Sequence, residues 1–258
     1  MNIGILGTGI IASALVNGFC TADNKVDIHF YLSPRNAEKA AALKNAYPDM
    51  ISVCTSNQEV IDNSEMVFLC LIPRMAEEIL KDVKFRPEQK VLSIMSDHSI
   101  AKVQSMVDNV GKIWRMVPLP FAAMHVGPIA YFPHDEEIDS LFAPLGNLIA
   151  VGKESELSVI SGLTGLMSAY YMLVHETVEF GMKQGLSRRT STDYMTAFYE
   201  ALDIKARAFD GADLKELAYE MTPGGLNEMA LKSILEADGY TPWTEALQKV
   251  MDRLNKKK

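Results

Sequence analysis

The sequence predicts an α/β fold in which an N-terminal Rossmann-type domain, a doubly wound parallel sheet, is followed by an all-α C-terminal dimerisation domain. Three features support this prediction. A glycine-rich turn follows an apolar run at the N-terminus, short β-rich runs alternate with helical runs as far as residue 150, and the pattern becomes almost entirely helical after residue 151. We therefore expect a dinucleotide-binding domain over residues 1–150 and a helical dimerisation domain over residues 151–258.

The first fifteen residues predict a strand, a tight turn and a helix start in direct succession. An apolar, isoleucine-rich run ends in the pattern Gly7-x-Gly9-x-x-Ala12. The first glycine permits the turn, the second lets the backbone approach phosphates closely, and the alanine lets the helix lie against the strand. Because the helix start then presents free N–H groups and a positive dipole end to an anion, the residues expected to bind a dinucleotide are Gly7, Gly9, Ile10, Ile11 and Ala12. An ordinary structural turn is the alternative interpretation.

Five further short runs are predicted to be strands of the parallel sheet: residues 27–32, 51–55, 64–73, 90–96 and 112–117. The run over residues 64–73 is apolar almost throughout, which is typical of a strand buried on both faces. We expect Leu71 and Pro73, at its end, to lie at the carboxyl edge of the sheet, where ligands bind in such folds. Residues 120–150 contain four prolines, which favour short strands and turns over a long helix.

The second half of the chain is predicted to be helical. The expected helices cover residues 154–185, 187–209 and 213–219, a segment after Pro223-Gly224-Gly225, and the stretch from Pro242 to the end. Several of them carry apolar residues on more than one face. Such helices need more partners than one small bundle supplies, so we expect them to pack against a second copy of the chain.

Composition limits the classes of function. The net charge of -8 and the isoelectric point near 5.2 argue against broad binding to nucleic acid or to anionic membranes. The three cysteines, Cys20, Cys54 and Cys70, are widely spaced in apolar surroundings and are expected to be reduced thiols of a cytoplasmic protein. Neither a signal peptide nor a membrane-spanning helix is expected. No grouping of His, Cys, Asp and Glu in the sequence has metal-site spacing, so no metal is expected.

The end of the second predicted strand indicates which dinucleotide binds. NAD-selective sites place a carboxylate there to accept hydrogen bonds from the ribose hydroxyls, whereas this chain has Leu32-Ser33-Pro34-Arg35. The Ser33 hydroxyl can donate to a phosphate oxygen, and the Arg35 guanidinium can pair with its charge. We therefore expect NADPH to be preferred over NADH, with a solvated arginine in a β–α loop as the alternative.

Short motifs occur along the whole chain, in the predicted dinucleotide-binding domain and in the helical half. In chain order, the informative motifs are Gly7-Thr8-Gly9-Ile10-Ile11-Ala12, Ser33-Pro34-Arg35, Arg115-Met116-Val117-Pro118, Thr164-Gly165 with Ala169-Tyr170, Gly185-Leu186-Ser187-Arg188, and Thr222-Pro223-Gly224-Gly225. In their order and spacing these motifs resemble the pyrroline-5-carboxylate reductase family from end to end. The resemblance implies an NAD(P)H-dependent imine reductase whose C-terminal helices interlock with a second subunit, with the active site near the dimer interface.

In that family, the loop that Thr222 to Asn227 resembles holds the substrate carboxylate through backbone N–H groups at a helix start and a hydroxyl side chain. The resemblance assigns substrate binding to Thr164, Gly224, Gly225 and Asn227, and catalysis to Thr222 and Asn227. A plain helix start, capped by Thr222 or Asn227, is the alternative. The implied reaction is NADPH-dependent reduction of the C=N bond in a small cyclic imine carboxylate, with Δ1-pyrroline-5-carboxylate to proline as the default.

Five positions depart from the family pattern: Leu119, Leu166, Met167, Leu226 and Asn227. The family has smaller or differently polar residues there, so the substrate pocket is expected to have a different shape. Two alternatives stay open. One is a reductase of the same fold that acts on a different imine or carbonyl in a secondary pathway, and the other is a non-catalytic regulatory protein that binds NADPH.

Two histidines are candidates for the proton donor of such a reaction. His98 and His125 are predicted to lie in loops on the ligand-binding side of the sheet, where either side chain could supply a proton. Solvated loop histidines without a catalytic role are the alternative.

Overall fold

The computed structural model describes residues 1–23, 27–107 and 110–255. These residues form two compact units, of which the first ends at Ser161 and the second begins at Gly162. The segment after residue 150 stays with the first unit, in part because the Glu154 carboxylate pairs with the Arg115 guanidinium within the sheet. The division therefore falls later in the chain than the predicted boundary at residue 150.

The described part of the first unit contains an eight-stranded sheet in the order β3-β2-β1-β4-β5-β6-β7-β8. The strands are β1 (Asn2–Leu6), β2 (His29–Leu32), β3 (Ile51–Val53), β4 (Met66–Leu69), β5 (Lys90–Ser93), β6 (Lys112–Val117), β7 (Pro128–Phe132) and β8 (Asn147–Ala150). Strands β1 to β6 are parallel, while β7 pairs antiparallel with β6 and parallel with β8. Because β1 lies between β2 and β4, the strand order reverses there, which creates the crevice at which such sheets bind ligands.

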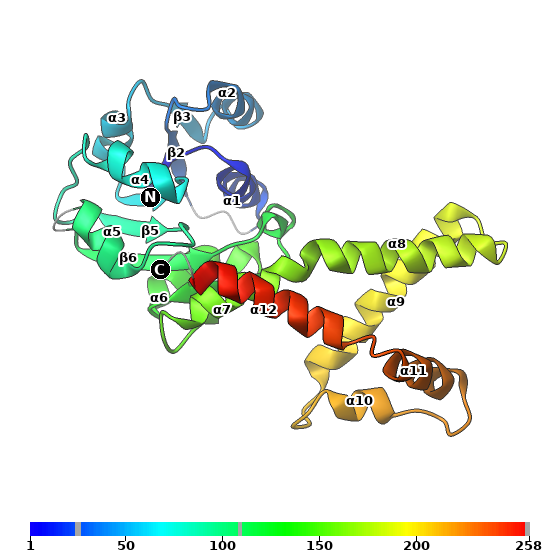
Figure 1. Ribbon diagram of the computed structural model, residues 1–258. Coiled ribbons are helices and arrows are strands. Elements are labelled where there is room, and N and C mark those ends of the chain that lie inside the picture. The colour runs from blue at the N-terminus through cyan, green and yellow to red at the C-terminus, as the bar shows by residue number, and fades with distance from the viewer. Residues whose placement is uncertain (24–26, 108–109, 256–258) are drawn as a thin grey trace. The chain divides into compact units, whose positions relative to one another are not determined.

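Helices cover both faces of this sheet (Figure 1). One face packs against α1 (Ile10–Thr21), α2 (Ala37–Ala46), α6 (Glu136–Phe142) and the 3-10 turns η1 (Pro120–Met124) and η2 (Ala143–Leu145). The other face packs against α3 (Asn57–Asp62), α4 (Pro73–Leu80) and α5 (Ile100–Val107). Side chains of β4 point alternately into the two cores, Met66 and Phe68 into one and Val67 and Leu69 into the other. The predicted strand buried on both faces is thus present, although it is shorter than the run 64–73.

Residues 120–150 contain the two short strands β7 and β8, as the prolines predict, and also the helix α6. This helix starts because the Asp135 carboxylate accepts a hydrogen bond from the Glu137 N–H at 3.0 Å. Acidic residues in its first turn interact favourably with the helix dipole. The prolines alone do not reveal this cap.

The second unit is helical. Its elements are η3 (Thr164–Leu166), α8 (Met167–Lys183), α9 (Arg188–Ala208), α10 (Lys215–Tyr219), α11 (Leu226–Glu236) and α12 (Thr241–Asn255). The predicted helix over residues 154–185 is interrupted at η3, which separates α8 from α7 (Glu156–Leu163) at the division between the units. The predicted fold class, a Rossmann-type sheet followed by an all-α domain, is confirmed.

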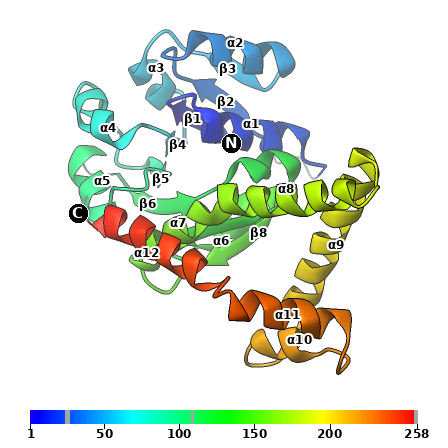
Figure 2. The same ribbon diagram turned by 45° about the vertical axis from the view of Figure 1, so that its right-hand side comes forward.

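A tight turn joins α8 to α9 (Figure 2). Gly185 adopts a φ of +100°, a conformation that favours glycine. The Leu186 N–H donates a hydrogen bond to the Gly181 carbonyl at 3.1 Å, which terminates α8. The Ser187 hydroxyl then caps α9 by accepting from the Thr190 N–H at 3.1 Å. The motif Gly185-Leu186-Ser187 is therefore a helix stop followed at once by a helix start.

Large apolar side chains of the second unit remain exposed in the single chain. Those on α8, α9 and α11 include Tyr171, Phe180, Tyr194, Phe198 and Leu226. The stretch Glu156–Lys183 has a length and composition that would allow it to cross a bilayer. The mean hydropathy of its most apolar 18-residue segment is 1.5, and 11% of that segment is buried. Helices that pack against a second protein chain have the same composition, so this stretch is weak support for a membrane span.

Candidate functional site

The glycine turn lies against the carboxyl end of β4. Gly7 has a φ of +95°, and a Cβ atom added to it would lie 2.5 Å from the Cys70 carbonyl oxygen. Gly9 is different, because a Cβ atom added there would have no atom within 4 Å. The first glycine therefore allows the strand and the turn to approach one another, and the second leaves open space in front of the α1 N-terminus.

Two polar side chains after β2 hold this turn in place. The Ser33 Oγ accepts a hydrogen bond from the Gly7 N–H at 3.0 Å, and the Ser33 side chain is buried. The Asn36 Nδ2 donates to the Thr8 carbonyl at 3.1 Å, while its Oδ1 caps α2 by accepting from the Lys39 N–H. Ser33, which the sequence predicts to contact a phosphate, thus positions the turn. Asn36 was missed, although an asparagine directly before an alanine-rich helix is a capping signal.

A cavity of about 480 Å³ lies in front of the glycine turn, lined by Gly7, Thr8, Gly9, Arg35, Asn36, Ala37, Glu38, Cys70, Leu71 and Ile72. The start of α1 has no side-chain cap and no acidic residue in its first turn. Its first-turn N–H groups are therefore available to an anion. The Thr8 Oγ1 is buried and has no hydrogen-bond partner among the described residues. These features fit the pyrophosphate of a dinucleotide.

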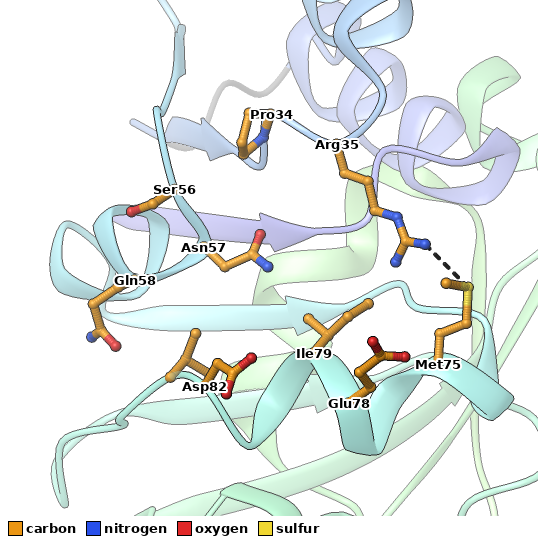
Figure 3. A pocket seen from close by; sticks show the side chains of 10 residues that line it. Pro34, Arg35, Ser56, Asn57, Gln58, Met75, Glu78, Ile79 and Asp82 are labelled. Atoms are coloured by element: carbon orange, nitrogen blue, oxygen red, sulfur yellow. Dashed lines mark hydrogen bonds between the residues drawn. The ribbon is translucent and has the colours of Figure 1, made fainter.

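A second cavity of about 540 Å³ (Figure 3) shares Arg35 with the first. It is lined by Pro34, Arg35, Ser56, Asn57, Gln58, Met75, Glu78, Ile79, Asp82 and Val83. The Arg35 Nη2 lies 3.1 Å from the Met75 Sδ, and Arg35 forms no ion pair with any described residue. Its positive charge is therefore available between the two cavities. The lining residues on α3 and α4 were missed, because they come from separate parts of the chain.

The end of β4 supplies the opposite wall of the first cavity. Leu71 is buried and lines the cavity, whereas Pro73 begins α4 and does not line it. Ile72 between them is 57% exposed. Burial raises the pKa of the Cys70 thiol, which keeps it neutral at physiological pH. This wall therefore offers an apolar surface without charge.

His125 lies in the loop between β6 and β7, where both of its ring nitrogens contact other residues. Its Nε2 lies 3.0 Å from the Thr21 Oγ1, at the end of α1, and its Nδ1 lies 2.9 Å from the Pro144 carbonyl. This loop leaves the carboxyl end of β6 and leads into the antiparallel strand β7, while Thr21 is the last residue of α1. His98 follows β5 at the carboxyl edge, and its buried Nδ1 has no partner among the described residues. Of the two, His98 alone has a buried ring nitrogen without a described partner.

The predicted substrate loop, within the second unit, is a turn that leads directly into α11. The Gly225 N–H donates to the Thr222 carbonyl at 2.9 Å, and Gly224 takes the positive φ of +73° that this turn needs. Gly225 is the N-cap of α11 and provides no side-chain cap. Thr222 and Asn227 are both exposed. The loop therefore presents a hydroxyl, an amide and first-turn N–H groups together.

The remaining predicted substrate residue, Thr164, lies half-buried in η3. The next residue, Gly165, packs closely against α12, since a Cβ atom added to it would lie 3.2 Å from Val250. Leu166 and Met167 follow at the start of α8 and are also half-buried. The small residue in Thr164-Gly165 thus serves helix packing within the second unit.

Comparison with known proteins agrees with this architecture. Residues 2–97 match the family described as NADP oxidoreductase, coenzyme F420-dependent. The chain is 24% identical to pyrroline-5-carboxylate reductase of Corynebacterium melassecola, covering 97% of this chain and 96% of that protein. It is 23% identical to pyrroline-5-carboxylate reductase 2 of Bacillus subtilis (strain 168), covering 91% and 87%.

Solved structures show the same fold. The 1-pyrroline-5-carboxylate reductase of Streptococcus pyogenes superposes with a TM-score of 0.84 at 19% identity, covering 98% of each chain. The pyrroline carboxylate reductase of Plasmodium falciparum with NADP bound has a TM-score of 0.84 at 18% identity, covering 100% of this chain and 98% of that one.

The fold, the glycine turn and these relatives together define an NAD(P)H-dependent oxidoreductase of the Rossmann class. Within that class the chain resembles the pyrroline-5-carboxylate reductases over nearly its whole length and is a divergent relative of that family. The resemblance that its motifs predict is confirmed.

Proposed function

We propose that the protein is an NADPH-dependent reductase of the C=N bond in a small cyclic imine, with Δ1-pyrroline-5-carboxylate to proline as the default member of this reaction class. One observation carries the proposal: relatives that match nearly the entire chain are pyrroline-5-carboxylate reductases. The glycine turn and the two adjoining cavities support it, because they form a suitable site for a dinucleotide.

In this proposal, NADPH supplies the hydride when it is bound. The first-turn N–H groups of α1 bind its pyrophosphate, and Gly9 allows the backbone to come close. Arg35 pairs with the 2′-phosphate from its position between the cavities, while Met75 and Ile79 offer an apolar surface to the adenine ring. Ser33 contributes by holding Gly7 in place.

On the substrate side we assign the imine to the loop before α11. An imine reductase needs an oriented acceptor carbon and a nitrogen that is protonated or hydrogen-bonded. The Thr222 hydroxyl and the Asn227 amide are exposed and can each donate such a hydrogen bond. Thr164, Gly224 and Gly225 complete the proposed substrate-binding set.

A reductase of the same fold with another imine or a carbonyl as substrate is the second candidate. Leu226, at the first position of α11, is 81% exposed, and an amide stands at Asn227. Leu166 and Met167, in the same unit, are likewise large and apolar. A bulky or less polar acceptor would suit them better than a small polar one.

The test is a turnover assay that follows NADPH absorbance with Δ1-pyrroline-5-carboxylate and with a panel of other cyclic imines and carbonyl compounds. Oxidation of NADPH with the carboxylate imine at rates of about 1 s⁻¹ or more supports the default reaction. Turnover of a different panel member alone supports the second candidate. Tight NADPH binding without turnover of any compound would contradict both and favour a non-catalytic, NADPH-binding regulatory protein.

Replacing Arg35 by alanine is expected to raise the dissociation constant for NADPH by about 10- to 100-fold and to leave that for NADH nearly unchanged. The reason is the loss of a charge-assisted contact with the 2′-phosphate, which NADH lacks. Fluorescence titration with both dinucleotides measures the effect. Lys81→Ala, which removes an exposed cation at the end of α4, is the matched control. Equal losses for the two dinucleotides would remove the argument for NADPH preference.

We also propose that the protein is a homodimer or a higher homo-oligomer formed through its C-terminal helices. The exposed apolar residues of α8 and α9 support this, because a single chain leaves them in water. Light scattering is expected to give at least twice the chain mass of 28.6 kDa at micromolar concentration. A monomeric mass under these conditions would contradict the proposal.

A cytoplasmic location is proposed on the state of the cysteines. Cys20, Cys54 and Cys70 form no disulfide within the described residues, and burial raises the pKa of Cys54 to about 11. Such thiols are typical of a reducing compartment. Fractionation of the cells that express the protein tests this, and recovery in an extracytoplasmic fraction would contradict it.

A further inference from the structure

The start of α11 carries a carboxylate that belongs to the chain itself. The Gly224 N–H donates to the Glu228 Oε2 at 2.5 Å, and the Glu228 Oε1 accepts from the Lys232 Nζ at 2.5 Å. The Glu228 side chain is only 22% exposed, so it lies against the loop and does not extend into water. An anion is therefore already present beside the turn Thr222–Gly225.

Within residues 216–240, no spare cation is left to bind a second anion. Lys232 is the only lysine or arginine between residues 216 and 240, and its ammonium group is paired with Glu228. The negative charge of Glu228 in the first turn also balances the positive end of the α11 dipole. Hydrogen bonds from Lys232 and from Gly224 lower the pKa of Glu228, so this carboxyl is ionised at neutral pH.

Helix capping alone does not account for this contact. In a capping box the glutamate side chain accepts from the N–H of the N-cap residue. Here the N-cap is Gly225, whose N–H already donates to the Thr222 carbonyl at 2.9 Å. Glu228 reaches one residue further, to Gly224, and so covers the outer face of the turn.

We propose that Glu228 excludes a carboxylate from this loop, and that the preferred acceptor is a cyclic imine without a carboxylate on its ring. This inference rests on the proposed function, since it takes the loop before α11 as the substrate loop. A substrate carboxylate at the first-turn N–H groups would lie close to a like charge, whereas an uncharged ring would not. The exposed side chain of Leu226 offers such a ring an apolar contact.

The first experiment compares two acceptors with the wild-type protein at saturating NADPH. One is Δ1-pyrroline-5-carboxylate and the other is 1-pyrroline, the same ring without the carboxylate. The expected result is a kcat/KM for 1-pyrroline that is higher by about ten-fold or more. Calorimetric binding of the two reduced rings to the NADP⁺ complex gives an independent measurement, in which proline is expected to bind more weakly than pyrrolidine by a similar factor.

The variant Glu228→Gln tests the charge itself, because its amide oxygen can still accept from the Gly224 N–H. The ratio of kcat/KM values, 1-pyrroline to carboxylate imine, is expected to fall by about ten-fold. Glu236→Gln, an exposed glutamate at the other end of α11, is the matched control and is expected to leave the ratio unchanged. Circular dichroism establishes that both variants are folded.

The outcomes separate the inference from the proposed function. Turnover of both rings with the carboxylate imine preferred would overturn the inference and leave the proposed function standing. An unchanged ratio in a folded Glu228→Gln protein would also overturn it, because the charge would then have no effect. Absence of turnover and of ring binding in every combination would refute the proposed function, and the inference with it.

Discussion

Replacing Gly7 by alanine is expected to weaken NADPH binding by about 100-fold or more. Gly7 holds a φ of +95°, and the new Cβ atom would lie 2.5 Å from the Cys70 carbonyl oxygen. This neighbour is a backbone atom at the end of a central strand, so it cannot rotate away as a flexible side chain would. The turn must shift, and the hydrogen bond from the Gly7 N–H to the Ser33 Oγ is lost with it. Fluorescence titration with NADPH measures the effect.

Gly9→Ala is the control that separates strain in the protein backbone from steric exclusion of the dinucleotide. Gly9 has a φ of −91°, which alanine adopts freely, and the added Cβ atom would have no protein atom within 4 Å. We expect this variant to melt at the wild-type temperature and still to bind NADPH more weakly, because the methyl group occupies space in front of the α1 N-terminus. Wild-type NADPH affinity in Gly7→Ala would show that the turn is not the pyrophosphate site.

The fold could be predicted because its determinants are local in the sequence. A parallel strand covered on both faces needs apolar residues at successive positions, and β4 shows this directly in Met66–Leu69. The turn before α1 is equally local, since its glycines and the helix that follows are adjacent. Element ends were less accurate, because strand pairing with neighbours decides where each strand stops.

The parts of the site that could not be predicted depend on contacts between distant residues. Ser33 contacts Gly7 across 26 positions, and Asn36 contacts Thr8 across 28. No periodic pattern reports on either contact, so Ser33 was interpreted as a phosphate ligand and Asn36 was not noticed. His125 shows the same limit, since only the tertiary fold brings it to Thr21. The pair of Gly224 and Glu228 is closer in sequence, but its hydrogen bond depends on how the turn is formed.

Removing the Glu154 carboxylate is expected to destabilise the first unit by about 3 kcal/mol. The Arg115 guanidinium is almost fully buried, with Nη1 at 2.8 Å from the Glu154 Oε1 and Nη2 donating to the Ser96 carbonyl at 2.9 Å. The same Glu154 oxygen accepts from the Ile100 N–H at 2.7 Å. Glu154→Ala therefore leaves a buried positive charge and a backbone donor without their acceptor. Urea unfolding followed through the buried Trp114, in a Trp243→Phe background, measures the loss.

Two comparisons decide whether the unpaired charge of Arg115 causes the loss of stability in Glu154→Ala. Replacing both Arg115 and Glu154 by leucine removes the charge together with its partner, so this double variant is expected to be more stable than Glu154→Ala alone. Glu77→Ala breaks the exposed ion pair with Lys102 and is expected to cost much less stability, since water screens such pairs. A Glu154→Ala protein that loses no more than the Glu77→Ala protein would show that Arg115 finds another partner or reaches solvent. The segment after β8 would then be held to the sheet by its backbone hydrogen bonds and apolar contacts, and not by this ion pair.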